Sequence, residues 1–189
     1  MAAEFKPLLT PAEYLAFERT SETRHEYVAG ELVAMAGASR AHNLIQLDTA
    51  TSLNLQLRSR GCDVYPSDMR VKIGPLGIYT YPDITIVCGE SELEDSEQDT
   101  LLNPTAIIEI FSPSTERYDH DLKFRRYQLI PSLRHYLLIA QDEPRVEHYT
   151  IGHDGELRLR VCRGVDTVVD LPALGCRLPL ADIYARITF

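Results

Sequence analysis

Two acidic residues occupy positions where a carboxylate is costly to bury. Asp83 follows Pro82 and opens the apolar stretch 84–87, and Glu109 interrupts the apolar run AIIEIF at 106–111. A buried carboxylate is stable only when it is paired or bound to a cation. Mg²⁺ is one such cation, because it accepts oxygen ligands and keeps water molecules for chemistry. The alternative for each acid is a structural ion pair with a neighbouring lysine or arginine.

The elements that would position these acids are extended segments in the middle of the chain. The segments 62–73, 80–89 and 104–112 are rich in apolar and β-branched residues, which is typical of strands. The last two contain nearly continuous apolar runs, which predicts central strands covered on both faces. After the break SPST, residues 116–130 are predicted to form a helix that ends before Pro131.

This predicted helix carries three polar residues at a spacing of four. Asp119, Lys123 and Tyr127 therefore share one face of the helix. A helix that packs on the sheet directly after Glu109 can direct a long side chain back to that strand. The alternative is a surface ion pair between Asp119 and Lys123, which would contribute only about 0.3–0.5 kcal/mol.

The N-terminal part predicts two helices and a hairpin. Thr10-Pro11 is typical of a helix start and predicts a helix over 11–20, and the next segment predicts two short strands that turn at Ala29-Gly30. Ser39 is a second helix-capping candidate, and the long helix that follows ends at Gly61. Its apolar residues at helical spacing are Leu44, Leu47, Thr51 and Leu55.

The C-terminal part predicts further strands in the same domain. RHYLLIA, RVEHYTI and ELRLRVCRG are strand candidates, Asp154-Gly155 offers a hairpin turn, and LADIYARI predicts a short terminal helix. The chain contains no repeat, low-complexity tract or linker, so we expect a single domain over 1–189. The pattern as a whole predicts the α+β class.

The net charge of −9 argues against a nucleic acid partner, because phosphate binding depends on lysine and arginine. Six of the acidic residues lie in the segment 90–99, ESELEDSEQD, which contains no lysine or arginine. The remainder of the chain is near −3. We expect this segment to be a solvated connection between two strands, which weakens the argument from charge.

Cysteine usage and the absence of a targeting pattern predict a cytoplasmic protein. The four cysteines, Cys62, Cys88, Cys162 and Cys176, form no zinc-type cluster, and we expect them to be buried and reduced. The first residues are not typical of a secretory signal, and no apolar run is long enough to span a membrane.

Several motifs together resemble a known family. TYPDITIVCG, PTAIIEIFSPST and RYDHDLKFRRYQ occur in this order, with EYVAGELVAMAGAS and Ala41-His42 before them and RHYLLIA after them. The combination is similar to the "putative restriction endonuclease" family (the Uma-two family) of the PD-(D/E)XK nuclease superfamily, over roughly residues 10–150. The resemblance implies a restriction-endonuclease-like fold, with a central mixed β-sheet flanked by helices and an added antiparallel C-terminal meander.

The resemblance also implies the core of an active site. Asp83 and Glu109 match the metal ligands of the superfamily, and the backbone carbonyl of Ile110 would join them in holding Mg²⁺ or Mn²⁺. The usual lysine lies two positions after the glutamate, where this chain has Phe111. The resembled branch supplies its amine from the following helix, as Lys123, to orient the attacking water.

Further residues and partners follow from the same resemblance. Possible supporting residues are His42, Glu31, Asp119 and Tyr127, and possible phosphate-binding residues are Arg117, Arg125 and Arg126. The implied function is that of a homodimeric, Mg²⁺-dependent endonuclease that hydrolyses DNA and has no membrane partner. Two alternatives remain open: a catalytically degenerate interaction module of the same fold, and a metal-dependent hydrolase of a small phosphorylated molecule.

Overall fold

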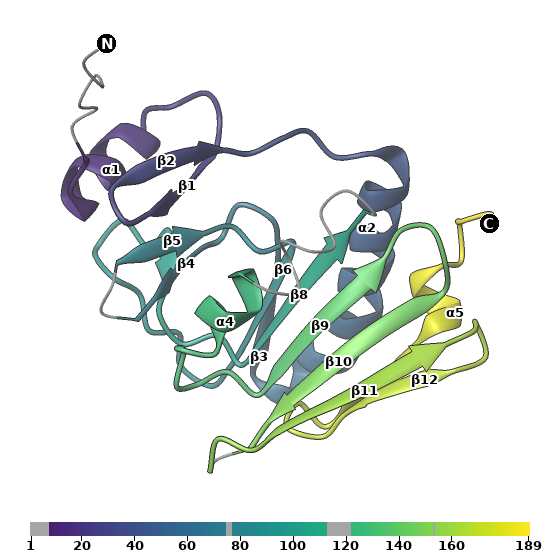
Figure 1. Cartoon of the computed structure of the whole chain (residues 1–189). Coiled ribbons are helices and arrows are strands. Elements are labelled where there is room, and N and C mark those ends of the chain that lie inside the picture. The colour runs from purple at the N-terminus through teal and green to yellow at the C-terminus, as the bar shows by residue number, and fades with distance from the viewer. Residues whose placement is uncertain (1–7, 75–76, 113–121, 153) are drawn as a thin grey trace.

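Two mixed β-sheets form the framework of the protein (Figure 1). The computed structural model describes residues 8–74, 77–112, 122–152 and 154–189. Within these residues the α+β class that the sequence predicts is observed, with a six-stranded sheet, a five-stranded sheet and a separate two-stranded hairpin. The five-stranded sheet is not anticipated by the sequence.

The six-stranded sheet contains both predicted acidic strands. Its strand order is β11-β10-β9-β8-β6-β3. Strands β8 and β9 run parallel, while the other neighbours are antiparallel, so β9, β10 and β11 form the expected C-terminal meander within this sheet. Every residue of β8 and β9 is buried, as expected for strands covered on both faces. The strands are β3 (Cys62–Pro66), β6 (Ile84–Cys88), β8 (Ala106–Phe111), β9 (His135–Ala140), β10 (Arg145–Ile151) and β11 (Leu157–Arg163).

The five-stranded sheet has the order β2-β1-β5-β4-β7. Two segments predicted as continuous strands are in fact divided between the sheets. The chain leaves the larger sheet after Pro66, where Ser67 and Asp68 both adopt a φ of 53°, and it returns through Pro82. A left-handed backbone at two successive residues turns the chain sharply. The strands are β1 (His25–Val28), β2 (Glu31–Ala34), β4 (Arg70–Ile73), β5 (Ile78–Thr80) and β7 (Thr100–Leu101).

Helices cover both faces of the six-stranded sheet. One face packs against α2 (Arg40–Leu57), α5 (Leu180–Ile183) and the hairpin of β12 (Val168–Leu171) and β13 (Cys176–Pro179), which the sequence did not predict. The other face packs against α4 (Phe124–Tyr127) and against β4 and β5. The remaining helices are α1 (Pro11–Glu18) and the 3₁₀ turn η1 (Arg58–Arg60). No helix among the described residues is long and apolar enough to cross a membrane.

The long helix α2 begins at its predicted cap but buries a different face. Ser39 caps the helix by accepting a hydrogen bond from the His42 N–H. The predicted apolar residues Leu47 and Leu55 are 55% and 59% exposed. The stripe that packs on the sheet is instead Ile45, Thr49, Ala50, Leu53 and Leu57. Two overlapping sets of residues on α2 are spaced at the helical period. Packing against β3 and α5 decides which of the two sets is buried.

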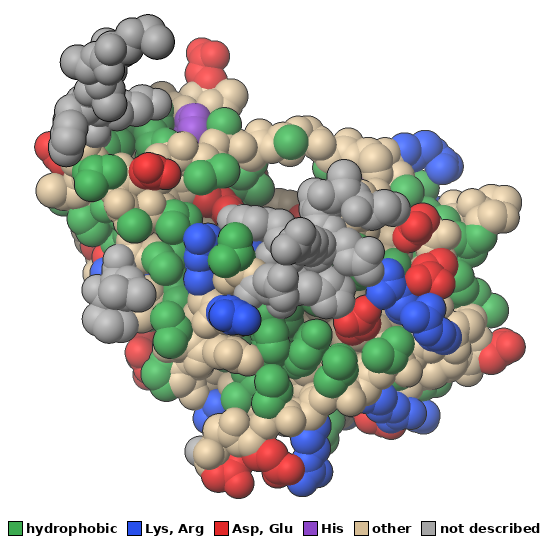
Figure 2. Space-filling model, viewed as in Figure 1, with side chains coloured by type: hydrophobic (Ala, Val, Ile, Leu, Met, Phe, Trp, Pro, Cys, Tyr) green, Lys and Arg blue, Asp and Glu red, His purple; other side chains and the backbone are tan. Residues whose placement is uncertain are grey.

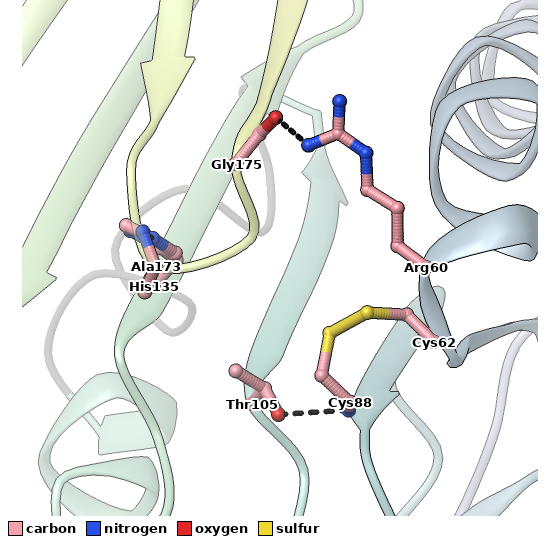
Figure 3. The surroundings of a disulfide bond; sticks show 7 residues. All are labelled: Arg60, Cys62, Cys88, Thr105, His135, Ala173 and Gly175. Carbon is pink, nitrogen blue, oxygen red and sulfur yellow. Dashed lines mark hydrogen bonds between the residues drawn. A yellow bond between two sulfur atoms is a disulfide. The ribbon is translucent and has the colours of Figure 1, made fainter.

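A disulfide joins Cys62 and Cys88, which corrects the expectation that all four cysteines are reduced (Figure 3). The antiparallel register of β3 and β6 places these residues opposite each other, with a Cα–Cα distance of 4.0 Å. The Cys88 N–H also donates to Thr105 Oγ1. Cys162 and Cys176 are buried free thiols. A sequence separation of 26 residues conceals this pairing until the register is known.

The acidic segment 90–99 is anchored rather than simply solvated. Arg19, the C-cap residue of α1, forms ion pairs with Asp95 and Asp99 at 2.7 and 2.9 Å, and Arg70 pairs with Asp99 at 2.7 Å. Hydrogen bonds from Arg19 hold the pKa of the Asp99 carboxyl well below its usual range. These contacts neutralise part of the acidic run, and they fasten it to the smaller sheet.

Two buried histidines predict a pH dependence of stability. His135 Nδ1 lies 2.9 Å from His148 Nε2, and burial lowers the pKa values of the two rings to about 3 and about 4. The unfolded chain protonates its histidines near pH 6.5, whereas the folded pair stays neutral. The stability that the pair contributes is therefore present above about pH 6.5, and it is lost as the pH falls towards the folded pKa values.

We expect the free energy of unfolding, measured with urea, to decrease from pH 7.5 to pH 5. The substitution His148→Gln keeps a hydrogen-bond acceptor for His135 but removes one titrating ring, so the decrease should become smaller. The control is Leu159→Gln, because Leu159 is an exposed residue of the neighbouring strand β11 without a titrating group, and it should leave the pH dependence unchanged. An unchanged pH dependence in His148→Gln would contradict the assignment.

Candidate active site

A cleft of about 580 Å³ opens where the ends of the two sheets meet the N-terminus of α2. Three predicted residues, Asp83, Glu109 and Lys123, all line it, together with Ile110 and His42. They come from the start of β6, from β8, from the N-terminal end of α4 and from the first turn of α2. The tertiary structure therefore brings the predicted acids and the predicted amine into one space.

Asp83 is held in place by contacts to both of its carboxylate oxygens. Oδ2 accepts a hydrogen bond from the Ile110 N–H at 2.7 Å, and Oδ1 lies 3.0 Å from His42 Nε2. The side chain of Gln46 donates to the Asp83 carbonyl at 2.6 Å, which fixes the backbone as well. Pro82 lacks an N–H group, so β6 begins only after this position. Asp83 thereby stands at the open end of the strand.

Glu109 faces Asp83 across the sheet. Ile84 pairs with Ile108 in antiparallel register, so the next residues, Asp83 and Glu109, lie opposite each other on the same face. Glu109 is almost fully buried, at 3% exposure. Its Oε1 accepts hydrogen bonds from Tyr127 at 2.7 Å and from Lys123 at 3.1 Å. These two donors explain how a carboxylate is tolerated within a central strand.

Lys123, the amine that the resemblance implies, lies at the N-cap of α4, and the usual lysine position is occupied by a core residue. Phe111 is 1% exposed and packs in the cluster beneath α4, with the Arg145 guanidinium 5.0 Å from its ring centroid. Lys123 and Tyr127 are four residues apart and both donate to Glu109, which confirms that they share a face. The described part of α4 is shorter than the predicted helix, and 116–121 lie outside the described residues.

Glu26 is a component of the cleft that the sequence did not identify. It lies on β1 of the smaller sheet, is 5% exposed, and places Oε1 3.5 Å from Lys123 Nζ. Lys123 therefore bridges carboxylates from both sheets. No signal distinguishes Glu26 in the sequence, because its neighbour in the cleft follows it by almost one hundred residues.

Glu31, the predicted glutamate of this hairpin, does not line the described cleft, which corrects that expectation. The register pairs Val28 with Glu31 and Glu26 with Val33. Glu31 therefore sits beside the turn and is exposed, two residues along β2 from Val33, the residue opposite Glu26.

Tyr127 is a neutral donor beneath the acidic residues. Burial raises its pKa well above the usual range, and the Glu109 and Glu26 carboxylates raise it further. Its hydroxyl donates to Glu109 and also lies 3.1 Å from Thr80 Oγ1. Because the single hydroxyl proton is directed at Glu109, Thr80 supplies the donor in the second contact. This chain links β5 of the smaller sheet to β8.

The remaining predicted residues lie elsewhere. Arg125 is exposed, Arg126 is partly exposed, and neither lines the described cleft. Both are on α4, where the face that turns towards the sheet carries Phe124 and Tyr127 instead. Arg117 and Asp119 lie outside the described residues.

The charges and donors of the described cleft suit a divalent cation. Three carboxylates and one ammonium line it, a formal charge of −2 with His42 neutral. Among the described residues no three acidic, histidine or cysteine side chains form a ready-made cluster. Mg²⁺ does not need one, because it commonly binds through one or two carboxylates and retains several waters. A strand residue directs its N–H and carbonyl to the same side, so the Ile110 carbonyl faces the side of Asp83.

The fold of this chain matches that of a solved structure. A crystal structure described as that of a putative nuclease from Anabaena variabilis ATCC 29413 superimposes with a TM-score of 0.72. The match covers 94% of this chain and 98% of that chain, at 21% sequence identity. This likeness confirms the predicted fold class.

The chain belongs to the Uma2 family, which is described as "Putative restriction endonuclease" and matches residues 11–181. Two uncharacterized proteins of Synechocystis sp. are similar. The first, sll1609, is 38% identical over 142 residues, which are 75% of this chain and 80% of that protein. The second, slr1290, is 31% identical over 183 residues, which are 97% and 95% of the two chains. The family supports a nuclease-like function.

The hydrogen bonds of Tyr127 predict a measurable contribution to stability. Tyr127→Phe should lower the free energy of unfolding by about 1–3 kcal/mol, because it removes a donor from a buried carboxylate. Urea unfolding at neutral pH measures this. Tyr65→Phe serves as the control, since the Tyr65 hydroxyl has only a 3.4 Å contact to Asp63, and it should change stability by less than about 0.5 kcal/mol. Equal effects of the two substitutions would show that the Glu109 contact carries no special energy.

Proposed function

We propose that this protein is a metal-dependent endonuclease that hydrolyses DNA phosphodiester bonds in the cleft formed by Asp83, Glu109 and Lys123. The observation that carries the proposal is the charge of the cleft. Two carboxylates face each other across β6 and β8, a third approaches from β1, and one lysine leaves a formal deficit equal to a divalent cation. Asp83, Glu109 and the carbonyl of Ile110 would hold Mg²⁺ or Mn²⁺.

The bound ion would supply Lewis acidity towards the phosphate and lower the pKa of a water molecule. The residues of the chain have separate tasks. Lys123 orients the attacking water and stabilises negative charge as it develops on the phosphate oxygens. Tyr127, which stays protonated, donates to Glu109 and fixes its position. His42 contacts Asp83 from the other side of the cleft, and it keeps that carboxylate aimed towards Glu109.

Lys123 also bears on the interaction-module alternative. Phe111 at the usual lysine position suggests a degenerate site, yet Lys123 places an ammonium 3.1 Å from Glu109. Lys123 therefore supplies the positive charge that the usual lysine position, occupied here by Phe111, does not. We accordingly favour an active site over an inactive copy of the fold.

Loss of the Glu109 charge should abolish most activity. With a mixture of linear single-stranded and duplex DNA and increasing Mn²⁺, Glu109→Gln should reduce the cleavage rate on the order of 100-fold or more. Glu156→Gln removes the same charge from an exposed position on the β10–β11 hairpin, and it should leave the rate unchanged. Wild-type activity in Glu109→Gln, or no cleavage by the wild-type protein at any Mn²⁺ concentration, would refute the proposal.

Glu26 should act as a positioning residue for Lys123. We expect Glu26→Gln to lower kcat about tenfold, which corresponds to ~1.4 kcal/mol, with little change in KM. Calorimetric Mn²⁺ affinity should also stay unchanged, because Glu26 would orient the ammonium without holding the metal. Glu31→Gln is the matched control on the same hairpin. A loss of Mn²⁺ affinity in Glu26→Gln would instead make Glu26 a metal ligand.

A further inference from the structure

The cleft is bridged by the segment that connects β2 to α2. Residues 35–39, MAGAS, form this strap, and all five line the cleft. In Figure 1 the segment crosses from the smaller sheet to the top of α2 as an extended span without helix or strand.

Both ends of the strap are anchored, on opposite sides of the cleft. At the first end the Met35 N–H donates to the Arg24 carbonyl at 2.9 Å, beside the β1–β2 hairpin. At the other end Ser39 caps α2 and its hydroxyl donates to Gln141 Oε1 at 2.6 Å, directly after β9. The Gln141 N–H in turn donates to the Phe111 carbonyl at the end of β8. The strap therefore ties the smaller sheet to the larger one across the site.

Open space lies around the strap. All five of its residues are exposed, although they line a cleft. A Cβ atom added to Gly37 would meet nothing within 4 Å. Ala36, Gly37 and Ala38 have the smallest side chains, so they leave the span thin. Figure 2 shows an opening in the surface beneath this span.

The size and charge of the cleft disfavour a duplex. A volume of about 580 Å³ lies within the range of about 300–1,000 Å³ for pockets that hold one small ligand. A duplex, whose major groove alone is about 12 Å wide, is far larger. Duplex DNA also presents a dense row of phosphates, whereas the described lining contains one lysine and no arginine.

The walls of the cleft suit a single strand. Besides the acids and Lys123, the described lining offers uncharged hydrogen-bonding side chains, namely Ser39, Asn43, Gln46, Ser67, Ser112 and Gln141. Unpaired bases expose their hydrogen-bonding edges to such groups, and paired bases do not. A single strand also carries a lower charge density than a duplex, so it needs fewer cations.

We infer that the substrate of this site is single-stranded DNA with a free end, threaded beneath the strap so that one phosphodiester reaches Asp83 and Glu109. This rests on the proposed nuclease function and specifies its substrate class. Because the strap is covalently continuous and anchored at both ends, a DNA single strand can pass beneath it only if a free end enters first. It excludes a closed circle and a continuous duplex.

Three DNA substrates of matched sequence test the inference in the presence of Mn²⁺. A linear single strand should be cleaved about tenfold or more faster than the same strand in a blunt duplex. A circular single strand should resist cleavage to a similar extent, although its bases and phosphates are identical. Equal rates on the circular and linear single strands, or faster cleavage of the duplex, would overturn the inference.

A bulky residue in the strap provides a second test. Ala36→Trp should obstruct the opening and reduce cleavage of the linear single strand about tenfold or more, with unchanged Mn²⁺ affinity. Ala16→Trp adds the same side chain at an exposed position of α1, and it should have no effect. An unaltered rate in Ala36→Trp would count against threading. Failure to cleave any of the three substrates would refute the nuclease function itself, whereas cleavage without preference would refute only the substrate class.

Discussion

The burial of Glu109 in a central strand is the constraint on which the arrangement of the site depends. An uncompensated carboxylate at this depth would be strongly destabilising. It is compensated by Tyr127 and Lys123, which reach it from the same face of α4. Tyr127 is linked in turn to Thr80 of the smaller sheet, so one buried acid fixes a helix and joins two sheets. These contacts concern the stability of the fold as much as its chemistry.

The place where the two sheets meet carries an excess of negative charge. Asp83 and Glu109 belong to the larger sheet, Glu26 belongs to the smaller one, and Lys123 lies between Glu26 and Glu109. One lysine does not balance three carboxylates, and in the proposed function a divalent ion held by Asp83 and Glu109 would neutralise the remaining charge. The smaller sheet is thus part of the candidate site. It contributes an acid, and through the strap it also forms the roof of the cleft.

In the proposed site, Lys123 supplies the ammonium from the N-cap of α4 and not from the strand that carries Glu109. The residue two positions after Glu109 is Phe111, which the core beneath α4 requires as an apolar side chain. Once that position is used for packing, the ammonium must come from another element that faces the same strand. A helix that follows β8 directly satisfies this requirement, because a lysine side chain is long enough to reach back to Glu109.

Local signals in the sequence determined the strand that carries Glu109, the strand that begins directly after Asp83, the caps at Thr10 and Ser39, and the shared face of Lys123 and Tyr127. Each of these depends on neighbours within a few residues, where spacing and side-chain chemistry are decisive. Only the tertiary structure decided the division of 62–73 and 80–89 between two sheets, the buried face of α2, the Cys62–Cys88 pairing and the entry of Glu26 into the cleft. These features depend on register and packing between segments far apart in the chain. The physical reason is that a strand or helix has the same local sequence pattern whichever segment it packs against. The pattern alone therefore does not specify the packing partner.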